Sequence, residues 1–292
     1  MDGTSAGIFR FMERIGVIGG GLMGSGIAEV CARAGSRVIV HEINAGAAEA
    51  ALGRIQKSLA RAVEREKLDD AGRDDILSRI DISTDISEQG DRQLVIEAAT
   101  ENEKLKKEIF SELDSVTGRD AILASNTSSI PITRLAAATE RPGKVVGLHF
   151  FNPVPVMALV ELVTTVLTDD GAANAVASYA ESLGKTVIRA KDRAGFIVNM
   201  LLIPYMIGAV RMYEAGFASA EDIDIGMKLG ANHPMGPLEL ADFVGLDTTK
   251  YVADVLFEEF KDPAYASPPL LTRMVEAGLH GRKTGRGFYD YR

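Results

Sequence analysis

Short apolar runs alternate with amphipathic stretches along the first two thirds of the chain. The run Arg14–Ile18 ends in three glycines, and apolar residues then recur at spacings of four, three and four. This stripe consists of Met23, Ile27, Val30 and Ala34. The period predicts a helix, which Gly35 ends, and Arg37–His41 is the next apolar run. Strand, glycine turn, helix and strand in this order indicate a βαβ unit, and therefore a parallel sheet covered on both faces.

Further apolar runs extend this sheet. Buried strands are predicted at Gln93–Ala99, Ala121–Ser125, Val145–Phe151, Leu159–Val163 and Lys185–Ala190. Two polar, charge-rich helices are expected within residues 44–80, and another helix over about 171–183. The helix after the first of these strands carries an apolar stripe of Leu105, Ile109, Leu113 and Val116. The pattern therefore predicts an α/β domain over residues 14–190.

Strand signals stop after about residue 190. Helices are predicted at about 195–215, 219–230, 237–260 and 268–277. We therefore expect an all-helical C-terminal domain over residues 191–292. Residues 1–13 are interpreted as an N-terminal extension without the pattern of a signal peptide.

Composition narrows the classes of protein that fit. The chain has 292 residues, 46% hydrophobic content and a formal net charge of −9, which is typical of a soluble globular protein and argues against a nucleic-acid or membrane partner. Cys31 is the single cysteine, so an internal disulfide and a multi-cysteine metal site are excluded. A reducing compartment, such as the cytoplasm, suits this cysteine count, and no metal site is expected.

A glycine-rich motif lies between the first strand and the first helix. It fits the pattern G-x-G-x-x-G and consists of Gly19, Gly20, Gly21, Leu22, Met23 and Gly24. In this motif the glycines allow a tight turn, a close approach of backbone to a pyrophosphate, and close packing of helix on strand. Because it stands after a strand and before a helix, it predicts a Rossmann-type, doubly wound, mainly parallel sheet that binds a dinucleotide.

Glu42 follows the second predicted strand, 18 positions after Gly24. A carboxylate at that position can accept hydrogen bonds from ribose hydroxyls and would repel a 2′-phosphate. Ile43 and Asn44 come next, and no arginine follows directly. The motif therefore favours NAD over NADP, although NADP stays open, and Glu42 could also be a solvated strand end.

His149 and Glu161 lie in two successive apolar runs that a turn rich in proline separates. If these runs are neighbouring strands, the carboxylate can hold one ring nitrogen while the other takes a proton. A structural histidine beside a surface glutamate is the alternative. The nucleotide motif upstream favours the catalytic interpretation, in which the pair acts as a general base for an alcohol dehydrogenation.

Two polar residues are candidates to contact the substrate oxygen. Ser128 lies in the loop after the strand Ala121–Ser125, at the carboxyl edge of the sheet where doubly wound folds bind ligands. Asn199 is a lone amide in the apolar stretch Phe196–Ile203. A structural cap or an interhelical hydrogen bond could equally account for each of them.

Several ordered blocks resemble the L-3-hydroxyacyl-CoA dehydrogenase family, in particular its short-chain, single-function type. The similarity runs from about Ile15 to the C-terminus. Besides the glycine motif and the His149–Glu161 segment, the blocks are Ser125–Ser129, Gly195–Asn199, Met235–Pro237, Asp242–Asp247 and Lys283–Tyr289.

This resemblance implies an NAD-dependent, reversible oxidation of a short-chain L-3-hydroxyacyl-CoA, such as 3-hydroxybutyryl-CoA. It implies that His149 is the catalytic base, that Glu161 is its partner, and that Ser128 and Asn199 lie near the reacting oxygen. It further implies cofactor contacts by Ser128, Asn152, Glu101, Lys106 and Lys283, and a homodimer formed through the C-terminal helices. The family's coenzyme A contacts come partly from the charged helices after the second strand, in a register that the sequence does not fix. A dehydrogenase of a free hydroxy acid and a non-catalytic nucleotide-binding homologue are the alternatives.

Overall fold

The computed structural model describes residues 12–292, so most of the predicted N-terminal extension lies outside the described residues. The chain separates into two compact units, of which the first ends at Asp192 and the second begins at Arg193. Each unit has its own hydrophobic core, and each is described by itself below.

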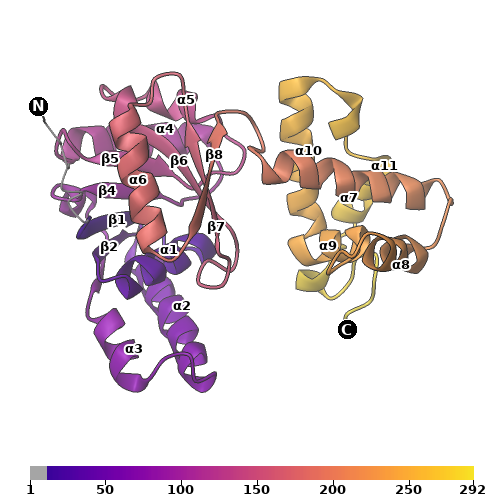
Figure 1. The fold of residues 1–292 in the computed structure, drawn as a ribbon, viewed down its shortest axis with the longest axis horizontal. Helices are drawn as coiled ribbons and strands as arrows, with labels where there is room; N and C mark the ends of the chain where they lie inside the picture. Colours follow the sequence, from indigo (N-terminus) through magenta and orange to yellow (C-terminus); the bar gives the residue numbers. More distant parts are fainter. Residues whose placement is uncertain (1–11) are drawn as a thin grey trace, which may run out of the picture. The chain divides into compact units, whose positions relative to one another are not determined.

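The first unit is built on an eight-stranded sheet of order β3-β2-β1-β4-β5-β6-β7-β8 (Figure 1). The strands are β1 (Arg14–Ile18), β2 (Arg37–His41), β3 (Ile80–Ser83), β4 (Leu94–Glu97), β5 (Ile122–Ser125), β6 (Val145–Phe150), β7 (Leu159–Thr164) and β8 (Thr186–Lys191). All neighbours pair in parallel except β6 and β7, which are antiparallel. The predicted mainly parallel, Rossmann-type sheet is confirmed.

Helices cover both faces of this sheet. They are α1 (Leu22–Arg33), α2 (Ala45–Glu64), α3 (Asp70–Leu77), α4 (Glu103–Val116), α5 (Ile132–Ala136) and α6 (Asp170–Ser182). Three of them begin where the sequence supplies a side-chain cap, because Asn44, Asp69 and Asn102 each accept a backbone N–H of the first turn. In Figure 1, α6 crosses one face of the sheet, with α4 and α5 behind it.

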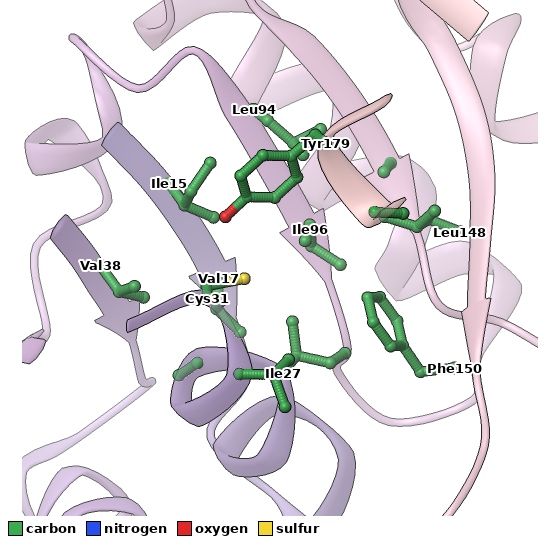
Figure 2. Close-up of a cluster of buried hydrophobic side chains, with 14 of the residues drawn as sticks. Ile15, Val17, Ile27, Cys31, Val38, Leu94, Ile96, Leu148, Phe150 and Tyr179 are labelled. Carbon is green, nitrogen blue, oxygen red and sulfur yellow. The ribbon is translucent and has the colours of Figure 1, made fainter. Parts of the chain in front are cut away.

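The core of the first unit fixes which way the central strands face. Leu148 and Phe150 of β6 join the apolar cluster that α1 and α6 build, beside Ile27 and Tyr179 (Figure 2). Val160 and Leu162 of β7 belong to the same cluster. Because successive side chains of a strand point to opposite faces, the residues between them turn to the other face, on the side of α5.

The second unit is helical within the residues described. Its helices are α7 (Val198–Glu214), α8 (Ala220–Gly230), α9 (Pro237–Val244), α10 (Leu246–Phe260) and α11 (Pro269–Glu276). Asp242 of α9 is buried and accepts hydrogen bonds from the backbone N–H groups of Phe288 and Tyr289, which fastens the C-terminal segment to the helices. Burial raises the pKa of this carboxyl, against the lowering effect of those hydrogen bonds.

The structure differs from the predicted local structure in four places. The segment 237–260 is two helices, because Gly245 has φ 104°, a conformation that favours glycine and ends α9. Strand β3 was missed because only Ile80 and Ile82 in it are apolar, and helix α5 was missed because it is only five residues long. In α4 the predicted apolar stripe was partly wrong, because Leu105 is 38% exposed and Lys106 takes a buried position instead.

Among residues 12–292, no helix is long and apolar enough to span a membrane. The same residues contain no group of three or more histidine, cysteine, aspartate or glutamate side chains placed to hold a metal ion.

Candidate active site

His149 and Glu161 face each other across the antiparallel pair β6–β7, where they are direct partners in the strand register. Their side chains are joined between His149 Nδ1 and Glu161 Oε2 at 2.7 Å. Glu161 is 0% exposed and His149 is 7% exposed. A carboxylate at Nδ1 favours the tautomer with its proton on that nitrogen, so that Nε2 is the ring nitrogen able to accept a proton.

The strand end that carries His149 is held from two sides. Asn126, which follows β5, accepts the backbone N–H of Phe150 with Oδ1 at 2.9 Å. The ring of Phe151 lies 4.6 Å from the imidazole, measured between centroids. These contacts hold the strand end beside the imidazole and pack one ring against it.

The predicted glycine turn has the geometry of a phosphate-binding loop. Gly19 has φ +90°, and a Cβ added at Gly24 would lie 1.7 Å from the carbonyl oxygen of Gly19. Helix α1 begins directly after Gly21, which supplies no side-chain cap to the N–H groups of the first turn. The helix end therefore presents backbone donors and a positive dipole end, which fit the pyrophosphate of a dinucleotide.

The close approach at Gly24 makes a testable prediction. Gly24→Ala should abolish measurable NADH binding and destabilise the fold by about 1–3 kcal/mol, because α1 has to move away from the glycine turn to admit a methyl group. Gly53→Ala is a matched control, since nothing lies within 4 Å of that added Cβ in the middle of α2. Fluorescence titration with NADH and thermal unfolding test both variants, and normal NADH affinity in Gly24→Ala would contradict the proposed packing.

Glu42 comes directly after β2 and reaches back to the glycine turn. Its Oε1 accepts the backbone N–H of Gly20 at 2.6 Å. Arg54 of α2 donates to the carbonyl oxygen of the same Gly20 at 3.1 Å. The backbone N–H and the carbonyl oxygen of Gly20 are thus both held, and the Glu42 carboxylate lies at the glycine turn.

Ser128 lies, half-buried, in the loop after β5. The residues on either side of it, Thr127 and Ser129, both donate their hydroxyl hydrogens to Glu101 Oε1. Lys106 lies beside them on α4, but its ammonium is buried and donates to Glu97 Oε1 at 2.6 Å. The structure therefore brings Glu101, Lys106 and Ser128 together, with a buried carboxylate at Glu97 that the sequence analysis missed.

The other predicted residues are placed separately. Asn152 is exposed at the start of the loop between β6 and β7. Asn199 and Lys283 belong to the second unit: Asn199 is the second residue of α7, and Lys283 donates to Asp247 Oδ2 at 2.5 Å. Burial is the largest single influence on Asp247 and disfavours its ionised form, but the hydrogen bonds from Lys283 and the backbone of Thr248, together with the charges of Lys283 and His280, lower the pKa of the carboxyl overall. Their roles at the site stay predictions.

The remaining histidines have structural surroundings. His233 Nδ1 lies 3.0 Å from the hydroxyl of Tyr205, and His280 Nε2 lies 3.1 Å from the carbonyl oxygen of Val275. Burial lowers the pKa of His41, which ends β2. Of the four histidines, His149 is the one in the described chain with a buried carboxylate at hydrogen-bond distance.

Two family models match the chain in succession. One, described as the NAD binding domain of 3-hydroxyacyl-CoA dehydrogenase, covers residues 14–193, and the other, described as its C-terminal domain, covers residues 195–291. A 3-hydroxybutyryl-CoA dehydrogenase of Mycobacterium tuberculosis is 57% identical over 282 residues, which are 96% of this chain and 99% of the relative. The 3-hydroxybutyryl-CoA dehydrogenase of Bradyrhizobium diazoefficiens is 47% identical over 96% of both chains.

Solved structures agree with these matches. The crystal structure of M. tuberculosis FadB2 has a TM-score of 0.95 and 56% identity, and the match covers 97% of this chain and 100% of that one. The (S)-3-hydroxybutyryl-CoA dehydrogenase PaaH1 of Ralstonia eutropha has a TM-score of 0.93 and 47% identity, with 96% and 99% covered.

The fold and the contacts at its glycine turn are those of an oxidoreductase that uses a nicotinamide dinucleotide. The match to the NAD binding domain of the family identifies that dinucleotide as NAD. The chain belongs to the 3-hydroxyacyl-CoA dehydrogenase family. The resemblance and the NAD cofactor inferred from the sequence are confirmed.

Proposed function

We propose that this protein catalyses the reversible, NAD-dependent oxidation of a short-chain L-3-hydroxyacyl-CoA, such as 3-hydroxybutyryl-CoA, to the 3-oxoacyl-CoA. The observation that carries this proposal is the buried contact of 2.7 Å between His149 Nδ1 and Glu161 Oε2. The substrate is supported by relatives at 47–57% identity that are named for 3-hydroxybutyryl-CoA.

His149 is the proposed general base. Its Nε2 takes the proton of the substrate hydroxyl, while NAD, when bound, accepts the hydride. Imidazole suits this step because it gains and loses protons near neutral pH, and a positioned base of this kind typically contributes about 10²–10⁴-fold to the rate. Glu161 stabilises the imidazolium that forms and keeps the ring in its orientation. In the reverse direction the same imidazolium returns the proton.

Ser128 and Asn199 are proposed to contact the substrate oxygen. A hydroxyl and an amide N–H can each donate to an oxygen that carries increasing negative charge as the proton leaves. Ser128 is half-buried in a loop whose flanking residues are fixed, and Asn199 is half-buried in the first turn of α7. These placements support the assignment of both residues.

The cofactor site is proposed to consist of the glycine turn, where backbone groups meet the pyrophosphate, and Glu42, which accepts ribose hydroxyls. Ser128, Asn152, Glu101, Lys106 and Lys283 are proposed to complete it. Lys106 would contribute by holding Glu101, because its own ammonium is buried against Glu97. The exposed basic side chains of α2, among them Lys57 and Arg61, are the proposed contacts for coenzyme A phosphates.

The experiment that tests this proposal is NADH oxidation at 340 nm with acetoacetyl-CoA, run beside free acetoacetate. Turnover with the thioester and little with the free acid would support the proposal. Turnover with acetoacetate alone would indicate a dehydrogenase of free hydroxy acids. If neither substrate is reduced but NADH binds, the proposed substrate is wrong, and the protein is either specific for another hydroxy compound or non-catalytic.

The preference for NADH over NADPH should depend on Glu42. Glu42→Ala should lower the NADH/NADPH ratio of kcat/KM by about 10–100-fold, because the carboxylate that accepts from ribose and repels a 2′-phosphate is lost. Glu49→Ala, at an exposed carboxylate of α2, should leave the ratio unchanged. An unchanged ratio in Glu42→Ala would show that other groups set the preference.

Two further expectations complete the proposed function. A homodimer through the helical unit is supported by large exposed apolar side chains on α7, α8 and the turn between them, which are Leu201, Phe217 and Leu229. A cytoplasmic location is supported by the single cysteine, Cys31, which is a free, buried thiol and suits a reducing compartment. Light scattering coupled to size-exclusion chromatography tests the dimer, and a monomeric mass at micromolar concentration would contradict it.

A further inference from the structure

A buried ion pair lies beneath the carboxyl edge of the sheet. Glu97, which ends β4, is 0% exposed, and Lys106 of α4 is 1% exposed. Their charged groups meet at 2.6 Å between Lys106 Nζ and Glu97 Oε1. Because taking two charges out of water is costly, a buried ion pair is weak evidence for a role in stability. The other contacts of Glu97 and Lys106 indicate a role other than stability for this pair.

Glu97 connects the end of β4 to the loop after β5. Its Oε1 also accepts the backbone N–H of Ala99 at 2.7 Å, and its Oε2 accepts the hydroxyl of Ser125 at 2.6 Å. The Ser125 oxygen accepts the backbone N–H of Thr127 at 3.2 Å. Both carboxylate oxygens of Glu97 therefore accept hydrogen bonds. One of them, through the Ser125 hydroxyl, is connected to the segment that carries Ser128.

Lys106 connects the same carboxylate to Glu101. Besides Glu97, its ammonium meets the carbonyl oxygen of Ala99 at 3.2 Å and Glu101 Oε2 at 3.3 Å. The ammonium donates hydrogen bonds to Glu97 and Ala99, and its contact with Glu101 is an ion pair. Lys106 thus reaches the predicted cofactor region only through Glu101.

Glu101 in turn holds both neighbours of Ser128. Its Oε1 accepts the hydroxyls of Thr127 and Ser129, the latter at 2.7 Å. The Thr127 oxygen accepts the backbone N–H groups of Ser129 and Ile130 at 3.2 and 2.9 Å. The loop is therefore held by hydrogen bonds on either side of Ser128. The groups that hold it are connected to Glu97 through Glu101 and Lys106.

We infer that Glu97 is a positioning residue, which sets the loop that presents Ser128 to the reacting oxygen. It acts through Ser125 on one side and through Lys106 and Glu101 on the other. This inference rests on the proposed function, because the role of Ser128 is part of that proposal. A connected buried network of this kind specifies one arrangement of its members, since each unsatisfied group would be costly. A purely structural pair would instead fasten α4 to the sheet and leave turnover unaffected.

A double-mutant cycle distinguishes these two roles. Glu97→Gln, which keeps shape but removes the charge, should lower kcat for acetoacetyl-CoA reduction by about tenfold or more and change KM for the thioester less. When Glu97→Gln is added to Ser128→Ala, kcat should fall only about twofold further, because the group that Glu97 positions is already gone. Full multiplication of the two single effects would overturn the inference.

Glu29→Gln is the matched control. Glu29 is 1% exposed on α1 and pairs with Arg33 at 2.7 Å, so that it is an equally buried, ion-paired glutamate away from the loop. This variant should lose stability and keep its kcat. If Glu97→Gln does not fold, Ser125→Ala carries the test, because it removes the hydroxyl between Glu97 and the Thr127 N–H with a smaller perturbation. When Ser125→Ala is combined with Ser128→Ala, the fall in kcat should again be smaller than the product of the two single effects.

Amide hydrogen exchange gives a readout that needs no activity. Exchange at the N–H groups of Ser129 and Ile130 should accelerate by about tenfold or more in Glu97→Gln or Ser125→Ala, and stay unchanged in Glu29→Gln. An inactive wild-type protein would refute the proposed function, while this readout would still decide whether Glu97 orders the loop. Unchanged exchange in both loop variants would overturn the inference.

Discussion

Replacing His149 by alanine should lower kcat for acetoacetyl-CoA reduction by about 10²–10⁴-fold, the usual contribution of a positioned acid–base group. The reason is that His149 is the group proposed to give and take the proton, and Glu161 alone cannot replace it from its buried place in β7. Steady-state kinetics at 340 nm measures the effect. NADH affinity should stay within about twofold of the wild-type value, because the glycine turn lies on other elements.

His233→Ala is the control for this prediction. His233 is an exposed histidine whose Nδ1 meets the hydroxyl of Tyr205, and its loss should leave kcat unchanged. If His149→Ala retained a turnover within a factor of ten of the wild type, His149 would not be the base. If NADH affinity collapsed together with kcat, a loss of structure and not of proton transfer would explain the result.

Glu161→Gln should lower kcat by at least about 10²-fold with little change in shape. The amide has no negative charge to stabilise the imidazolium that forms in the reaction. It can also turn its NH₂ group toward Nδ1, which favours the tautomer with the proton on Nε2, where no further proton can be accepted. Comparison of kcat at saturating NADH and acetoacetyl-CoA checks this prediction.

Asp114→Asn is the matched control for Glu161→Gln. Asp114 is a mostly buried carboxylate that pairs with Arg141 at 2.6 Å, and it lies at the other end of α4 from Glu101 and Lys106. We expect Asp114→Asn to reduce thermal stability and to leave kcat unchanged. An effect on kcat of equal size in both variants would show that any buried charge change disturbs turnover, and the special role of Glu161 would be lost.

The apolar runs were enough to predict most strands of the sheet and the approach of His149 to Glu161, whose catalytic role stays a prediction. Leu148, Phe150, Val160 and Leu162 are apolar because they pack into one core, and this turns His149 and Glu161 to the other face together. The glycine turn was equally visible, since its geometry requires glycine at fixed positions.

The apolar pattern failed where a charge is buried. In α4 it selected Leu105 for the core, whereas the structure buries Lys106, because Glu97 at the end of β4 needs a cation. A hydrophobic pattern cannot predict such an ion pair, because the pair forms only when a strand and a helix pack together. A signal was nevertheless present, because Glu97 is a carboxylate in an apolar strand, as Glu161 is.

The pairing of His149 with Glu161 also bears on the order in which the protein folds. The two residues are only 12 positions apart and meet through adjacent antiparallel strands, so that little chain entropy is lost in closing the loop between them. The glycine turn and Glu42 meet across a longer βαβ crossover, and parallel pairing of this kind closes more slowly. We therefore expect the amides of β6 and β7 to gain protection before those of β1 and β2 in pulse-labelled refolding. The proton-transfer pair would then be assembled while the chain is still unable to hold a nucleotide.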